Sequence, residues 1–123
     1  MTPPRMRPWG LAVLLLMGCG AASGPSDAQD APLVRGPIES ITHHATATGM
    51  VVRAAPGSRE MCGISATVDH ATRIQRRTAA GALAPAALAE LEVGDTVEVY
   101  VSGPVAESCP VQGRADAVVA SPR

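Results

Sequence analysis

The chain has 123 residues, contains one Trp, one Tyr and no Phe, and carries a formal net charge of −1 at pH 7. Nucleic-acid binding calls for a basic face and often for stacking aromatic side chains, so this composition excludes nucleic acid as an expected partner. Sugar-binding platforms, which also rely on exposed aromatic rings, are equally unexpected. The length suits one small domain behind an N-terminal segment.

The N-terminal segment has the pattern of a secretory signal. Residues 1–10 carry two basic residues, Arg5 and Arg7, and no acid, and residues 11–17 form the apolar run LAVLLLM. A basic start followed by a short apolar core is typical of a signal peptide. The run is shorter than the roughly 20 apolar residues of a transmembrane helix, so a cleaved signal is favoured over a membrane span.

The signal ends in a sequence, LMGC at residues 16–19, that resembles the bacterial lipobox. In lipoproteins this cysteine takes a diacylglyceryl group, and a small residue before it gives the peptidase access to the bond. We therefore expect residues 1–18 to be a lipoprotein signal peptide and Cys19 to be acylated with palmitate or a similar chain. Two or more chains give stable anchoring. Cleavage as an ordinary signal peptide near residues 21–23, which would discard Cys19, is the alternative.

Residues 19–32 are the expected tether between the lipid and the domain. They read CGAASGPSDAQDAP, which is small, polar and interrupted by two prolines, as in flexible linkers. No Asp follows Cys19 directly, so the expected location is the cell envelope, lipid-anchored in the outer membrane and facing the periplasm. Cleavage removes Arg5 and Arg7, which leaves eight basic residues against eleven acids.

Residues 33–123 are expected to form one mainly β domain. Strict alternation in residues 64–69 and 95–103 is typical of half-buried strands. In residues 38–42 the isoleucines Ile38 and Ile41 are three apart, which breaks the period of two and indicates a β-bulge. The expected strands, in chain order, are residues 38–42, 49–54, 64–69, 72–77, 95–103 and 115–120.

One segment favours a helix. Residues 85–91 begin with Pro85, which the first turn of a helix tolerates, and continue with alanines and with Leu88 and Leu91 three apart. The pattern predicts a helix of two turns at most. Five or six short strands with one short helix indicate a small antiparallel barrel, closed or nearly closed.

The C-terminal half contains LEVGDTVEV at residues 91–99 and GPVAESCPVQGRA at residues 103–115. These segments resemble the YobA-like family of small bacterial exported proteins, and the resemblance covers residues 83–119. Members are similar to OB-type barrels, often have a lipoprotein signal and have no known function, so the resemblance implies an OB-like β-barrel without assigning catalytic residues. The chain departs from the family at Cys109, where members commonly have Tyr.

Cys62 and Cys109 are the two thiols that remain once Cys19 is lipidated. An even number of cysteines in an oxidising compartment favours a disulfide between them over two free thiols. Redox catalysis is not expected, because the chain has no Cys-x-x-Cys motif. In the loop around Cys109, Glu107 and Ser108 are either hydrogen-bonded to the turn backbone or in contact with a ligand.

The three histidines, His43, His44 and His70, raise the question of a metal site. Neighbouring side chains on a strand face opposite sides, so His43 and His44 do not easily share one ion, although a loop would relax this limit. No spacing in the chain matches a known metal cluster, and exposed polar residues are the simpler interpretation.

These patterns predict a membrane-anchored, non-enzymatic binding or interaction module without a cofactor. Its partners would be membrane lipid, through acylated Cys19, and an envelope protein or a small ligand. The alternative from another class is a periplasmic metal-binding protein that uses His and Cys ligands. An enzyme is the weakest hypothesis, because Ser108 lacks a Gly-x-Ser-x-Gly setting and the acids around residues 90–95 read as a solvated turn.

Overall fold

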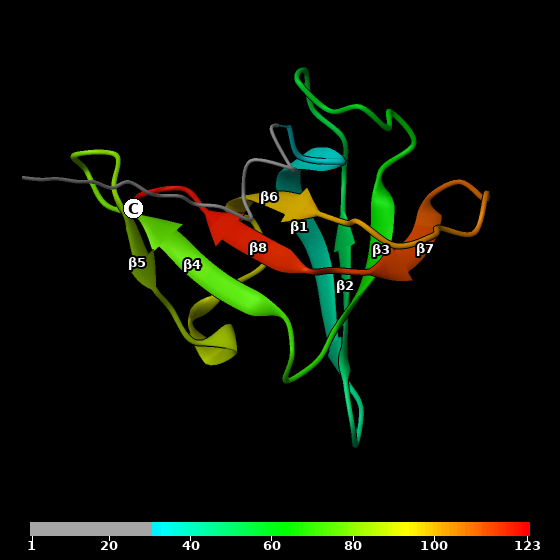
Figure 1. The fold of residues 1–123 in the computed structure, drawn as a ribbon, viewed down its shortest axis with the longest axis horizontal. Coiled ribbons are helices and arrows are strands. Elements are labelled where there is room, and N and C mark those ends of the chain that lie inside the picture. The colour runs from blue at the N-terminus through cyan, green and yellow to red at the C-terminus, as the bar shows by residue number, and fades with distance from the viewer. Residues whose placement is uncertain (1–30) are drawn as a thin grey trace, which may run out of the picture. The chain divides into compact units, whose positions relative to one another are not determined.

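The computed structural model describes residues 31–123, which form one curled eight-stranded sheet with the shape of a half-barrel (Figure 1). The predicted signal peptide, Cys19 and most of the predicted tether lie outside the described residues. The order across the sheet is β5-β4-β8-β6-β1-β2-β3-β7. The strands are β1 Val34–His43, β2 Thr48–Val52, β3 Ile64–Val68, β4 Arg73–Arg77, β5 Leu83–Pro85, β6 Thr96–Tyr100, β7 Val111–Arg114 and β8 Ala117–Ala120.

Strand β1 belongs to both halves of the sheet. Its first residues, 34–37, pair with β6, and residues 38–43 pair with β2, both antiparallel. The register shifts between Ile38 and Ser40, where the spacing of the isoleucines predicted a bulge. An irregularity of this kind bends and twists a strand, which lets β1 follow the curl of the sheet.

The core consists of aliphatic side chains on the concave face, and the alternation of the strands explains it. Ile64, Ala66 and Val68 of β3 are at most 1% exposed, and Val97 and Val99 of β6 are fully buried. These are the inward positions that the period of two predicted. Val101 continues the alternation of Val97 and Val99 within the segment 95–103, but it lies beyond the end of β6 and is only partly buried.

Two pairings differ from the antiparallel barrel of five or six strands that the sequence predicts. Strand β3 pairs with β7 in parallel, and β4 pairs with β8 in parallel. Ala115 and Asp116 alone separate β7 from β8, and the buried Thr72 hydroxyl donates a 2.8 Å hydrogen bond to the Ala115 carbonyl at this crossing. The strand count was too low because β5 and β7 have only three and four residues, too short for a clear alternation.

The predicted helix at residues 85–91 is largely wrong. Pro85 ends strand β5, opposite Gln75 of β4, and the Ala86 N–H donates to the Ile74 carbonyl, so sheet pairing holds the segment extended. What remains is a single 3-10 turn, η2 Leu88–Glu90, because so short a stretch cannot offset the cost of nucleating an α-helix. Within residues 31–123, no helix is long and apolar enough to cross a membrane.

Gly36 of β1 is required by the close approach of two backbone segments. A Cβ atom at this position would lie 1.9 Å from the Arg53 carbonyl oxygen, which is backbone and cannot rotate away. The neighbouring hydrogen bonds, from the Arg53 N–H to the Pro37 carbonyl and from the Ala55 N–H to the Arg35 carbonyl, hold the two segments together. The chain after β2 is therefore fastened to the first half of β1.

We expect Gly36→Ala to lower the free energy of unfolding by about 2 kcal/mol, as overpacking in a fixed backbone contact typically does. Gly103→Ala is the matched control, because a Cβ there meets nothing within 4 Å, and a change under about 0.5 kcal/mol is expected. Urea unfolding of both variants measures the difference. Equal stabilities of the two variants would contradict the role assigned to Gly36.

Candidate functional site

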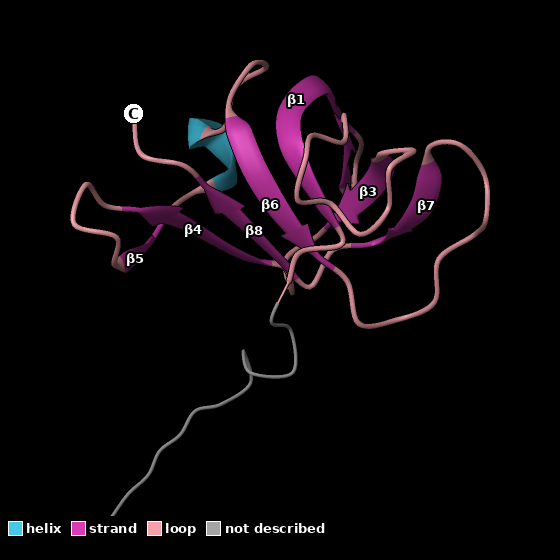
Figure 2. Cartoon of the chain, turned by 90° about the horizontal axis from the view of Figure 1, so that it is seen from above, coloured by secondary structure: helices cyan, strands magenta, loops and turns pink. Residues whose placement is uncertain are grey.

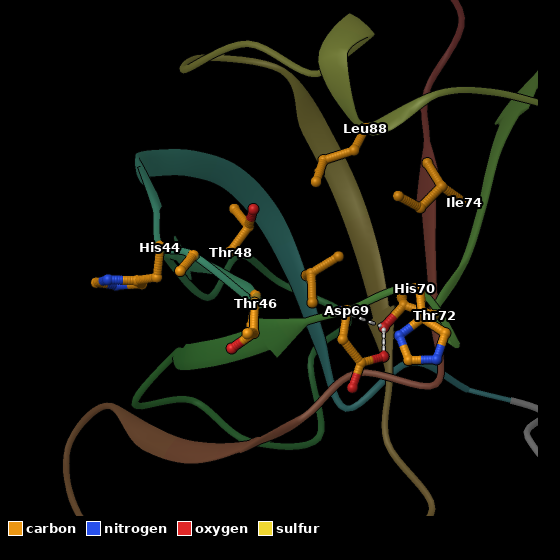
Figure 3. Close-up of a pocket in the computed structure, with 11 residues that line it drawn as sticks. His44, Thr46, Thr48, Asp69, His70, Thr72, Ile74 and Leu88 are labelled. Carbon is orange, nitrogen blue, oxygen red and sulfur yellow. Dashed lines mark hydrogen bonds between the residues drawn. The ribbon is translucent and has the colours of Figure 1, made fainter.

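A pocket of about 420 Å³ opens at the end of the half-barrel where β1 turns into β2 (Figure 3). Four segments build it: the β1–β2 turn, the end of β3 with the turn that follows, the first half of β4, and η2. The lining residues are His44, Ala45, Thr46, Ala47, Thr48, Val68, Asp69, His70, Thr72, Ile74 and Leu88.

One part of the pocket is aliphatic. Val68 is 1% exposed and belongs to the core, and Ile74 and Leu88 are partly buried and pack against that core. Figure 3 shows the Leu88 and Ile74 side chains together on the side formed by η2 and β4. The pocket is thus an extension of the core that reaches solvent between two turns.

The carboxylate in the pocket, Asp69, is held by Arg114 of β7. Arg114 donates from Nε to Asp69 Oδ2 at 3.0 Å and from Nη2 to Oδ1 at 3.2 Å, a two-bond ion pair. Oδ1 also accepts a 3.0 Å bond from the Ala71 N–H. The Arg114 bond and the Ala71 bond hold the pKa of Asp69 below its ordinary value, so this group is ionised and fully engaged.

The three histidines do not come together. His43 Nδ1 lies 3.1 Å from the Thr48 hydroxyl, whereas His44 and His70 line the pocket from two different turns. In Figure 3 the His44 ring points away from the cavity, and the His70 ring lies beside Thr72. Among residues 31–123 no three His, Cys, Asp or Glu side chains are grouped as a metal site requires. This geometry gives the metal-binding alternative no support.

The predicted disulfide is confirmed. Cys62 and Cys109 are joined, with an S–S distance of 2.12 Å and a Cα–Cα distance of 5.2 Å. The bond ties the β2–β3 loop to the β6–β7 loop at the start of β3. The pocket lies at the other end of that strand, about 13 Å away along the chain direction.

Glu107 and Ser108 lie in the loop before the disulfide and away from the pocket. The Ser108 hydroxyl donates a 2.7 Å hydrogen bond to the Pro110 carbonyl, and the Ser108 N–H donates to the Ala106 carbonyl at 3.0 Å. These bonds favour the interpretation of Ser108 as a turn residue over ligand contact. The Glu107 side chain is exposed, and its contact with a ligand stays a prediction.

Sequence reasoning missed a charged cluster on the outer face of β6. Glu98 accepts bonds at Oε1 from the Tyr100 hydroxyl at 3.1 Å and from Arg77 at 3.2 Å, and Arg35 lies 3.8 Å from Oε2. Burial, together with the Glu98 charge, raises the pKa of Tyr100, so its phenol stays protonated. The alternation of β6 placed Glu98 and Tyr100 on one face, but the arginines come from β1 and β4.

A second charged cluster joins β4, the turn before β6 and the C-terminal residue Arg123. Asp95 Oδ2 accepts from the Glu92 N–H at 3.0 Å and from Arg123 at 2.9 Å, and Arg76 lies 3.6 Å away. Burial works to raise the pKa of Asp95, but these bonds outweigh it, and the pKa lies below its ordinary value. Arg76 and Arg77 of β4 therefore serve separate ion pairs, since Arg77 pairs with Glu98 instead.

The comparisons found no relative: no family model, no curated protein and no solved structure matches the chain. The site therefore rests on its own geometry. No sequence pattern indicates the pocket, because its lining residues are mostly Ala, Thr and His from separate turns. Only the fold brings them together.

We expect Asp116→Asn to weaken the acid sensitivity of the protein. Hydrogen bonds from Ser102, together with Arg114 at 3.1 Å, hold the pKa of Asp116 below its ordinary value. A lowered pKa in the folded state stabilises the protein above the unfolded pKa of about 3.9, and this stability is lost as the pH falls through the lower folded value. The fall in unfolding free energy between about pH 5 and pH 2 should therefore be shallower in the variant.

The same substitution should lower the free energy of unfolding at pH 7 by about 1 kcal/mol, because a charged hydrogen-bond acceptor is lost. Glu107→Gln, at an exposed position, is the control and should keep the acid dependence of the wild-type protein. Urea unfolding at a series of pH values measures both. An Asp116→Asn curve parallel to that of the wild type would contradict the prediction.

Removal of the disulfide should destabilise the domain strongly. The bond closes a loop over a sequence separation of 47 residues, which corresponds to about 4 kcal/mol in the chain-entropy model. The double variant Cys62→Ser/Cys109→Ser and the reduced wild-type protein should therefore unfold at similar, much lower urea concentrations. A double variant within about 1 kcal/mol of the oxidised wild type would show that the bond contributes little.

Proposed function

We propose that the chain is a bacterial envelope lipoprotein whose domain is a non-enzymatic binding module. In this proposal residues 1–18 are the signal peptide, acylated Cys19 is the membrane anchor, and residues 19–32 are the tether. The location is the outer membrane, with the domain facing the periplasm. The partners are membrane lipid, through Cys19, and an envelope protein or small ligand bound by the domain.

The Cys62–Cys109 disulfide is the observation that carries this proposal. Disulfides form and persist outside the reducing cytoplasm, so a domain that is cross-linked by one is typical of an exported protein. The basic start, the short apolar run and the LMGC sequence supply the means of export and anchoring. Two independent features, one in the signal region and one in the fold, thus favour the same compartment.

We further propose that the half-barrel is OB-like and related to the YobA-like proteins. If β3 with β4 and β7 with β8 each count as one bent strand, the pairings run β1 to β2 to β3–β4 to β7–β8 to β6 and back to β1. This is the strand path of a five-stranded barrel with one parallel pair, and β5 is an addition to it. An OB-type barrel has five strands in a Greek-key arrangement.

A binding role fits the pocket better than catalysis does. Asp69 is the carboxylate of the cavity, and its ion pair with Arg114 keeps it ionised with both oxygens engaged. A general base needs a pKa near the working pH and a free oxygen aimed at the substrate. The Thr72 hydroxyl is likewise committed, to the Ala115 carbonyl.

Metabolic labelling with palmitate in the native host tests the anchor. The wild-type chain should take up label and sediment with membranes, and Cys19→Ser should lose both the label and the cleavage before residue 19. The double variant Cys62→Ser/Cys109→Ser also removes cysteines and should keep the label. An unlabelled wild-type protein, together with a Cys19→Ser form that is still cleaved and soluble outside the cytoplasm, would refute the proposal.

A further inference from the structure

We propose that the pocket between the β1–β2 turn and η2 binds an uncharged small molecule with an aliphatic face and a hydrogen-bonding group. The inference rests on the proposed binding function and names the class of ligand that the site accepts. It does not depend on how the chain is anchored, because all the residues involved lie in the domain.

The size and the aliphatic wall of the pocket set the apolar part of the ligand. A volume of about 420 Å³ lies within the range of small-molecule sites, roughly 300–1,000 Å³. Val68 is already buried, whereas Ile74 and Leu88, which pack against the core, are only partly buried. A ligand with saturated carbons would bury these two side chains further and gain the free energy of removing apolar surface from water.

The charges around the pocket exclude an ion as the preferred ligand. Asp69 is the one Asp, Glu, Lys or Arg among the residues that line the pocket, and Arg114 neutralises it through two hydrogen bonds. A charged ligand would lose its hydration without gaining a counter-ion, which is costly. A neutral ligand pays no such penalty.

The polar contacts with a ligand would come from residues at the rim of the pocket. The hydroxyls of Thr48 and Thr72 already bond to His43 and to the Ala115 carbonyl. Thr46 and His70 are exposed at two edges of the cavity, each with a side chain that can donate or accept a hydrogen bond. One hydroxyl or amide on the ligand could therefore reach Thr46 or His70 while the carbons face Leu88.

Hydrogen–deuterium exchange measured by mass spectrometry tests the inference. The sample is the full chain, purified from the cell fraction that contains it. If the protein is bound to the membrane, it is kept in nanodiscs. Cyclohexanol is the neutral probe, and cyclohexanecarboxylate and cyclohexylammonium carry the same ring with a charge. Cyclohexanol should slow exchange in peptides covering residues 44–48 and 68–74 in a saturable manner, and should leave residues 53–63 unchanged. Each ion should need at least about ten times the concentration for equal protection, which corresponds to 1.4 kcal/mol.

Blocking variants locate the effect. Thr46→Trp should fill the cavity from its rim and abolish the protection, and Ala45→Trp on the same turn serves if the first variant does not fold. Ala80→Trp, in the exposed β4–β5 turn, is the control and should respond as the wild type does. No saturable protection by cyclohexanol, equal protection by either ion, or protection that persists in a folded blocking variant would each overturn the inference. Loss of palmitate labelling would overturn the anchor alone.

Discussion

The structure depends on the way β1 is shared between the two halves of the sheet. Its first four residues pair with β6 and the rest pair with β2, with a register shift between them. The backbone beyond β2 returns so close to β1 that only a glycine fits at position 36. The curl of the sheet is therefore fixed at one strand, and the concave face that the aliphatic core fills follows from it.

The polar groups outside the core are arranged in pairs that join distant strands. Arg114 links β7 to Asp69 after β3, and Arg77 links β4 to Glu98 on β6. These pairs are partly exposed, and such ion pairs typically contribute less than about 1 kcal/mol each. Their consequence is chemical: the pair with Arg114 engages Asp69, the carboxylate that lines the pocket.

Prediction from the sequence succeeded where the pattern is local and periodic. It failed where pairing between distant segments determines the structure. The alternation in residues 64–69 and 95–103 predicted β3, β6 and their buried faces, and the even number of cysteines after the expected signal peptide predicted the Cys62–Cys109 bond. The helix expected at residues 85–91 gave way to pairing of Pro85 with β4, which no local propensity reveals. The parallel pairs and the pocket could not be predicted either, since both depend on segments far apart in the chain.

The two ends of the half-barrel are covered by different elements, and this difference explains the pocket. At one end the disulfide ties the β2–β3 and β6–β7 loops together, close to where Leu33 leads into β1. At the other end, the helical part of residues 31–123 is the single turn η2 (Figure 2), of which only Leu88 lines the pocket. A longer helix would bury Ile74 against its own apolar stripe, as amphipathic helices do. With one turn in its place, Ile74 and Leu88 remain partly exposed at the end remote from residue 33.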